Sequence, residues 1–119
     1  MKTITLNKEE YVSKKDYEAL ARKKAGKVTV GGNEIPFVVG GKYFIRTVTY
    51  FATGRVAEVK GNFLVLEDAA WIADTGRFRE AIMSGVLSEV EPVEVPMYLN
   101  INTITDAFEW SHELPRDQK

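Results

Sequence analysis

The sequence contains no cysteine among its 119 residues. This absence excludes a disulfide framework, a thiolate metal site and a cysteine nucleophile, and it suits a reducing compartment. No apolar run approaches the roughly 20 residues that a membrane-spanning helix requires. The first ten residues lack the apolar core of a signal peptide. These absences predict a cytosolic protein with no membrane partner, and nothing in the sequence calls for a cofactor or a metal.

Excess charge of either sign is also missing, because the formal net charge is -1. Proteins that bind duplex nucleic acid usually carry a strongly basic face, so no duplex partner is expected. Hydrophobic residues make up 45% of the chain and charged residues 28%, which is ordinary for a globular protein. A chain of this length most simply forms one domain, over residues 1–119.

Residues suited to catalysis are few and poorly placed. The only histidine, His112, lies in a polar C-terminal stretch with few apolar anchors for a Ser-His-Asp triad. Glu67 and Asp68 are neighbours, so on a strand they face opposite ways and cannot act as a carboxylate pair. Glu89 and Glu91 share a strand face, but no third oxygen ligand is suggested nearby. We therefore expect a protein that is not an enzyme.

The hydrophobic patterns predict an α+β fold. This is a mostly antiparallel, twisted sheet with a short N-terminal helix, ending at Gly26, and one helix near 76–84. Residues 46–59 and 63–72 should pair as a hairpin around the turn at 60–62. The remaining predicted segments are a hairpin of 27–30 with 34–39, one long strand region over 43–59, short strands within 86–95, 98–101 and 104–110, and an extended or frayed tail over 111–119.

The stretch 66–78 carries the strongest indication of a binding site. A strand brings Trp71 to a turn at 74–76, and a helix then begins with Arg77 and Phe78. Unpaired N–H groups at a helix start, with an arginine beside them, suit an anion, and an aromatic ring offers a surface to a base. Arg55, on the preceding strand beside Gly54, adds a second arginine close to aromatic residues. Such residues suit a small anionic ligand that contains a base and is bound without being transformed.

A plainer interpretation explains the same residues as structure. Trp71, Phe78 and Ile82 would be core residues, and Asp74 or Thr75 would be an ordinary N-cap. The residues alone favour this second interpretation. Apolar residues on both faces of the strands at 44–45 and 63–66 also suggest more apolar surface than one small domain covers, so a homo-oligomer is expected.

Beyond these patterns, about two thirds of the chain resembles a family of small phage proteins, the Thoeris anti-defence proteins of the first type. The segment 66–78 is the most specific part of the resemblance. The segments that carry it are 47–50, 53–56, 66–78, 89–92, 106–107 with Trp110, and 114–115.

The resemblance implies binding without chemistry. Family members sequester glycocyclic ADP-ribose signals made by TIR-domain enzymes, and some also take up cyclic oligonucleotide signals of CBASS defence, such as cyclic trinucleotides. They act in the cytoplasm of the infected bacterial host as homo-oligomers, dimers or hexamers, with ligand pockets around protomer contacts. The family's binding phenylalanine matches Phe78, and a second position, usually asparagine, falls on Ser88. Trp71, Arg77 and Arg55 are added on physical grounds, and the alternative function is a phage structural or assembly protein whose aromatic residues serve subunit contacts.

Overall fold

The computed structural model describes residues 27–30 and 32–119, so the expected N-terminal helix lies outside the described residues. The chain divides into two compact units, residues 1–39 and 40–119. In the first unit, β1 (Lys27–Val30) and β2 (Asn33–Val38) form the predicted antiparallel hairpin. The single domain over residues 1–119 remains a prediction.

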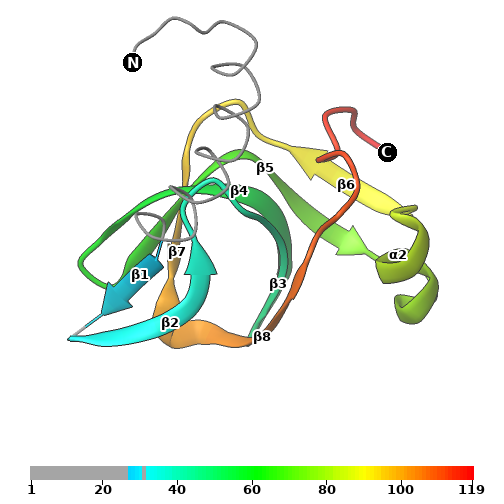
Figure 1. The fold of residues 1–119 in the computed structure, drawn as a ribbon. Coiled ribbons are helices and arrows are strands. Elements are labelled where there is room, and N and C mark those ends of the chain that lie inside the picture. The colour runs from blue at the N-terminus through cyan, green and yellow to red at the C-terminus, as the bar shows by residue number, and fades with distance from the viewer. Residues whose placement is uncertain (1–26, 31) are drawn as a thin grey trace, which may run out of the picture. The chain divides into compact units, whose positions relative to one another are not determined.

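The second unit is built on a curved antiparallel sheet (Figure 1). Its strand order is β6-β5-β4-β3-β8, and β7 also pairs with β5. A single α-helix, α2, is present among the described residues, so the predicted mostly antiparallel α+β fold is confirmed. The elements are β3 (Lys42–Thr47), β4 (Phe51–Lys60), β5 (Phe63–Asp74), α2 (Phe78–Ser84), β6 (Glu89–Pro92), β7 (Met97–Asn100), the 3-10 turn η1 (Ile101–Thr103) and β8 (Ile104–Glu109).

The hairpin of β4 and β5 is the longest paired region of the sheet, running from Lys60 opposite Phe63 to Phe51 opposite Ile72. Its pairing confirms the predicted hairpin, and the long strand region predicted over 43–59 consists of two strands, β3 and β4. The Thr47 hydroxyl accepts the amide of Tyr50 and donates to its carbonyl oxygen, and this turn separates β3 from β4.

Gly54 of β4 lies opposite a bulge in β5. Thr53 pairs with Ala70 and Arg55 with Glu67, so two β5 residues, Asp68 and Ala69, face the single residue Gly54. A Cβ added at Gly54 would lie only 3.0 Å from the Cβ of Leu66, so the residue also marks a close approach of the two strands.

The sheet curls because its two edges are joined by a very short connection. One half of β5 pairs with β6 and the other half with β7, so both occupy the same edge. From β7 the 3-residue turn η1 leads directly into β8, which pairs with β3 at the opposite end of the strand order. Two edges that are one short turn apart in the chain must approach each other at this corner.

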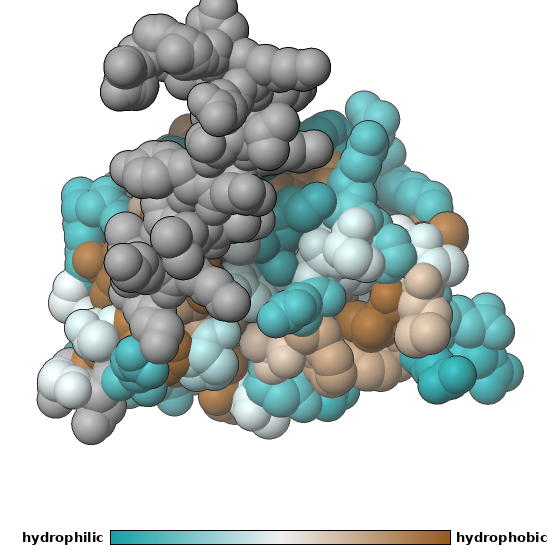
Figure 2. All heavy atoms as spheres, in the orientation of Figure 1, coloured by the Kyte–Doolittle hydropathy of each residue, from teal (hydrophilic) through white to brown (hydrophobic). Residues whose placement is uncertain are grey.

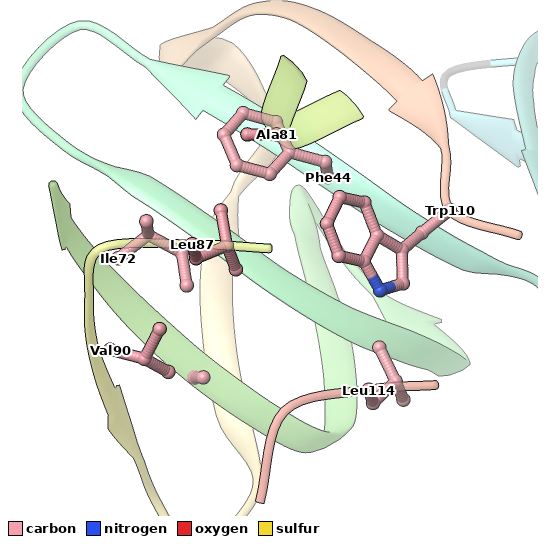
Figure 3. Close-up of a cluster of buried hydrophobic side chains, with 8 residues drawn as sticks. Phe44, Ile72, Ala81, Leu87, Val90, Trp110 and Leu114 are labelled. Carbon is pink, nitrogen blue, oxygen red and sulfur yellow. The ribbon is translucent and has the colours of Figure 1, made fainter. Parts of the chain in front are cut away.

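One face of the sheet is packed by α2 and the C-terminal segment (Figure 3). Phe44 and Trp110 stack with their ring centroids 5.9 Å apart, and Ala81 of α2 lies beside Phe44 (Figure 3). The buried side chains of this core cluster are Phe44, Ala70, Ile72, Ala81, Leu87, Val90, Trp110 and Leu114.

The C-terminal segment is held in place, so the frayed tail that the sequence suggested is wrong. Leu114 is buried, and the indole N–H of Trp110 donates to the carbonyl oxygen of Glu113. Lys119 donates its amide to Val90 and accepts the Val90 amide in return, at 2.9 and 3.1 Å. The polar composition concealed these contacts because most of them use backbone groups.

Candidate functional site

The helix α2 begins without the N-cap that the sequence suggested. Its N-cap residue is Arg77, which makes no side-chain cap hydrogen bond. Asp74 instead accepts the amide of Gly76 at 2.8 Å, and the Thr75 hydroxyl donates to the Gly76 carbonyl at the same distance. Assigning the N-cap to Asp74 or Thr75 is therefore wrong, because both side chains are used in the turn before the helix. The predicted helix near 76–84 is confirmed over 78–84.

Phe78, on the first turn of α2, is half-buried against the core cluster. Its ring meets Phe44 and Phe108 edge-on, with centroid distances of 5.8 and 5.4 Å. Phe51 and Ile82 pack against the same cluster. The plainer interpretation is thus correct in part, since Phe78 contributes to packing, but its ring also reaches the surface.

Arg46 of β3 lies beside Phe78. The guanidinium carbon of Arg46 lies over the Phe78 ring, 4.6 Å from its centroid, and 5.9 Å from the centroid of Phe108. Such cation–π contacts contribute about 0.5–1 kcal/mol at exposed sites. In the region between β8 and α2, Figure 2 shows hydrophobic surface bordered by hydrophilic side chains. An aromatic group and a cation therefore meet at this surface.

Asp106 fixes the orientation of Arg46. The two residues face each other in the β3–β8 pair, and Arg46 donates from Nε to Oδ1 at 2.7 Å and from Nη2 to Oδ2 at 2.5 Å. These hydrogen bonds, more than the Coulomb attraction, hold the pKa of Asp106 below its ordinary value and raise the pKa of Arg46. The guanidinium is thus a fixed, fully charged plane at the surface.

Ser88 and Arg77 lie at the same corner as Phe78. The Ser88 amide donates to the Asp74 carbonyl at 3.0 Å, and a Cβ added at Gly76 would lie 2.7 Å from the Ser88 hydroxyl oxygen. Ser88 is therefore held against the turn at 74–76 that leads into Phe78. The exposed Arg77 follows this turn and directly precedes Phe78 in the chain. Three of the five predicted site residues share this corner.

Trp71 and Arg55 do not join that corner. Trp71 precedes Ile72 on β5, and because Ile72 belongs to the core cluster, Trp71 points to the opposite face of the sheet, where it is 41% exposed. Arg55 donates to Asp68 at 2.8 Å. It lies four residues along β4 from Phe51, about 13 Å at the usual rise per strand residue.

Sequence reasoning missed Arg46, Asp106 and Phe108. The sequence held a weak signal for a site at these residues, because strand alternation puts Arg46 on the same face as Phe44 and Asp106 on the same face as Phe108. The contact between these two strands brings together residues 60 positions apart, which no local pattern encodes.

His112 takes part in packing. Its Nε2 lies 2.8 Å from the carbonyl oxygen of Ile82, and its ring meets Trp110 edge-on at 4.8 Å. Within residues 27–30 and 32–119, no group of three or more histidine, aspartate or glutamate side chains is arranged to hold a metal ion. Among the same residues no helix has the length and apolar composition needed to cross a membrane.

No protein-family model matches the chain. Neither the curated proteins nor the solved structures include a match to it.

Proposed function

We propose that this protein binds glycocyclic ADP-ribose immune signals without transforming them and so blocks Thoeris defence in the cytoplasm of an infected bacterium. The observation that supports this proposal is the corner formed by Phe78, Arg77 and Ser88. Phe78 matches the binding phenylalanine of the family that the sequence resembles, and Ser88 occupies the second binding position with a hydroxyl in place of the family's usual asparagine amide. Arg46, held by Asp106, adds a second cation beside Phe78.

The chemistry of the corner suits such a ligand. A glycocyclic ADP-ribose presents an adenine, two phosphates and ribose hydroxyls. A stacked base contributes about 1–3 kcal/mol, and each hydrogen bond to a charged group about 1.5–3 kcal/mol. An aromatic ring, the guanidiniums of Arg46 and Arg77 and the Ser88 hydroxyl could together support roughly nanomolar binding after the cost of association. Cyclic trinucleotides of CBASS defence carry the same groups and form an extension of the proposal.

The protein is further proposed to act as a homo-oligomer, a dimer or a hexamer. Four large apolar side chains, Met83, Val86, Val95 and Tyr98, are between 62% and 66% exposed. Exposed apolar surface of this kind is typical of subunit contacts.

The same apolar side chains also favour the second candidate, a structural or assembly protein of a phage particle. In that case the packing of Phe78 against Phe44 and Phe108 would be its whole role. The two candidates differ in whether a nucleotide signal stabilises the fold.

Ligand-dependent melting tests the proposal. With glycocyclic ADP-ribose at a hundredfold excess over its dissociation constant, the folded protein should gain about 2.7 kcal/mol. Phe78→Leu retains most of the apolar volume, so it should cost less than about 1.5 kcal/mol of stability. It removes the aromatic face that a base or the Arg46 guanidinium requires, so it should also remove most of the ligand-induced gain. Phe78→Ala is less informative, because loss of the contacts with Phe44 and Phe108 would itself destabilise the fold.

Phe63→Leu is the matched control, because Phe63 is a partly exposed phenylalanine on β5. It should leave the ligand-induced gain unchanged. A wild-type protein whose melting temperature does not respond to the ligand would favour the structural alternative. A ligand recovered with an altered mass would instead identify an enzyme.

A further inference from the structure

One face of the Phe78 ring is already occupied by Arg46. The guanidinium carbon of Arg46 lies 4.6 Å from the centroid of that ring. The Phe78 ring also meets the rings of Phe44 and Phe108 edge-on. A base could reach this ring face only by displacing Arg46, and Asp106 opposes that movement with two hydrogen bonds.

Arg46 keeps capacity to bind a ligand after these contacts are made. A guanidinium has five N–H donors, and Asp106 accepts from Nε and from Nη2. Both Nη1 donors and one Nη2 donor therefore lie outside this bidentate pair. The Arg46 side chain is 35% exposed, so it reaches solvent although its guanidinium carbon lies over the Phe78 ring.

We propose that the outer face of the Arg46 guanidinium, rather than the Phe78 ring, is the surface on which the base of the ligand stacks. Guanidinium planes are common stacking partners of bases because they are flat, delocalised and weakly hydrated. Phe78 contacts the guanidinium through its ring and Asp106 fixes the rotation of that group, so both are positioning residues. This inference rests on the proposed function and adds the residue that contacts the base.

Arg46 has a second conceivable role, which is purely structural: it would only link β3 to β8 by bonding to Asp106, as a clip between the strands. The two roles predict different binding affinities for Arg46→Lys. Lysine retains the charge and can still pair with Asp106, so a clip would survive the replacement. It has no flat face, so a stacking surface would be lost. Arg46→Lys therefore separates the two roles.

The experiment compares Arg46→Lys with Arg79→Lys, the same replacement at an exposed position on α2. Affinity is measured by calorimetry with glycocyclic ADP-ribose and with adenosine 5′-monophosphate, and stability by melting. Arg46→Lys should weaken binding of both ligands by about tenfold or more, the expected cost of losing one stacked base. Arg79→Lys should stay within about twofold of wild type, and both variants should melt close to wild type.

A second readout uses the unmodified protein. The Arg46 Nε–H signal in ¹⁵N-resolved NMR, assigned in the wild-type protein through its correlations with the Arg46 side chain, should shift as adenosine 5′-monophosphate is added. This measurement decides the question if Arg46→Lys proves unstable. A signal that does not move, or an Arg46→Lys variant that binds both ligands as tightly as wild type, would overturn the inference.

The outcome also separates this inference from the proposed function. If wild-type protein and Arg46→Lys bind glycocyclic ADP-ribose equally well, the proposed function stands and the stacking role is refuted. Protein that binds the adenosine nucleotide through Arg46 but ignores glycocyclic ADP-ribose supports the stacking surface and refutes the function. Failure to bind either ligand refutes both.

Discussion

At the scale of single residues, Arg46 and Asp106 form the most constrained polar contact of the proposed site. Their bidentate geometry fixes a charged plane against Phe78 and also links β3 to β8. Each side chain is more than one third exposed, at 35% and 37%, so water screens the attraction and its contribution to stability is modest, about 0.5–1 kcal/mol. The pair therefore serves orientation more than stability.

The ionisation of Asp106 makes this contribution dependent on pH. Its folded pKa lies below the ordinary value, so the contribution is complete above about pH 4 and is lost as the pH falls through the folded pKa. Asp106→Asn should lower stability at neutral pH and reduce the steepness of the acid-side loss. Urea unfolding between about pH 6 and pH 2.5 measures this slope.

Asp117→Asn is the control, because Asp117 is exposed in the C-terminal segment. It should leave the slope as in wild type. An Asp106→Asn protein that loses stability in acid as steeply as wild type would show that Asp106 contributes nothing through its charge.

At the scale of elements, α2 ends where it meets the C-terminal segment. Gly85 adopts a left-handed conformation with φ of 80°, and its amide donates to the Ala81 carbonyl at 2.8 Å. A Cβ at this position would lie 2.5 Å from Cγ of His112. Gly85 therefore both ends the helix and makes room for the histidine ring.

This double role predicts an unequal effect of alanine at two glycines. Gly61, in the turn between β4 and β5, also has a positive φ of 58°, but nothing lies within 4 Å of an added Cβ. Gly61→Ala should cost about 1–2 kcal/mol from backbone strain alone. Gly85→Ala should cost about 1–3 kcal/mol more, because His112 must also move.

Urea unfolding of the two variants measures the difference. His112→Ala removes the clash that Gly85→Ala creates. His112→Ala should therefore cost less stability in the Gly85→Ala protein than in wild type. Equal losses for Gly61→Ala and Gly85→Ala would contradict the packing described for His112.

The elements also show what a sequence can predict. The hairpin of β4 and β5 follows from local signals, the turn at 60–62 and the alternation beside it, and its prediction was confirmed. The division of 43–59 depended on the Thr47 hydroxyl bonding to Tyr50, a turn that the hydrophobic alternation concealed. The pairing of β3 with β8 is set by contacts between distant residues, so Arg46 and Asp106 could not be recognised as partners. For the same reason Trp71 and Arg55 were grouped with Phe78, although they lie elsewhere on the sheet.

At the scale of the molecule, the curled sheet places the proposed site where β3, β8 and α2 meet. The last strands of the chain and the C-terminal segment complete this region, so residues from nearly the full length of the second unit contribute to it. Exposed apolar side chains lie on other elements, among them Met83 on α2 and Tyr98 on β7.

The most direct test of sequestration is to identify what the protein carries out of a cell. The tagged wild-type protein is purified from bacteria that contain an active TIR-domain enzyme, then denatured, and the released small molecules are identified by mass spectrometry. Wild-type protein should release intact glycocyclic ADP-ribose in amounts comparable to the protein, and Phe78→Leu should release little or none. Wild-type protein that carries no such molecule, or carries only a cleavage product, would contradict sequestration.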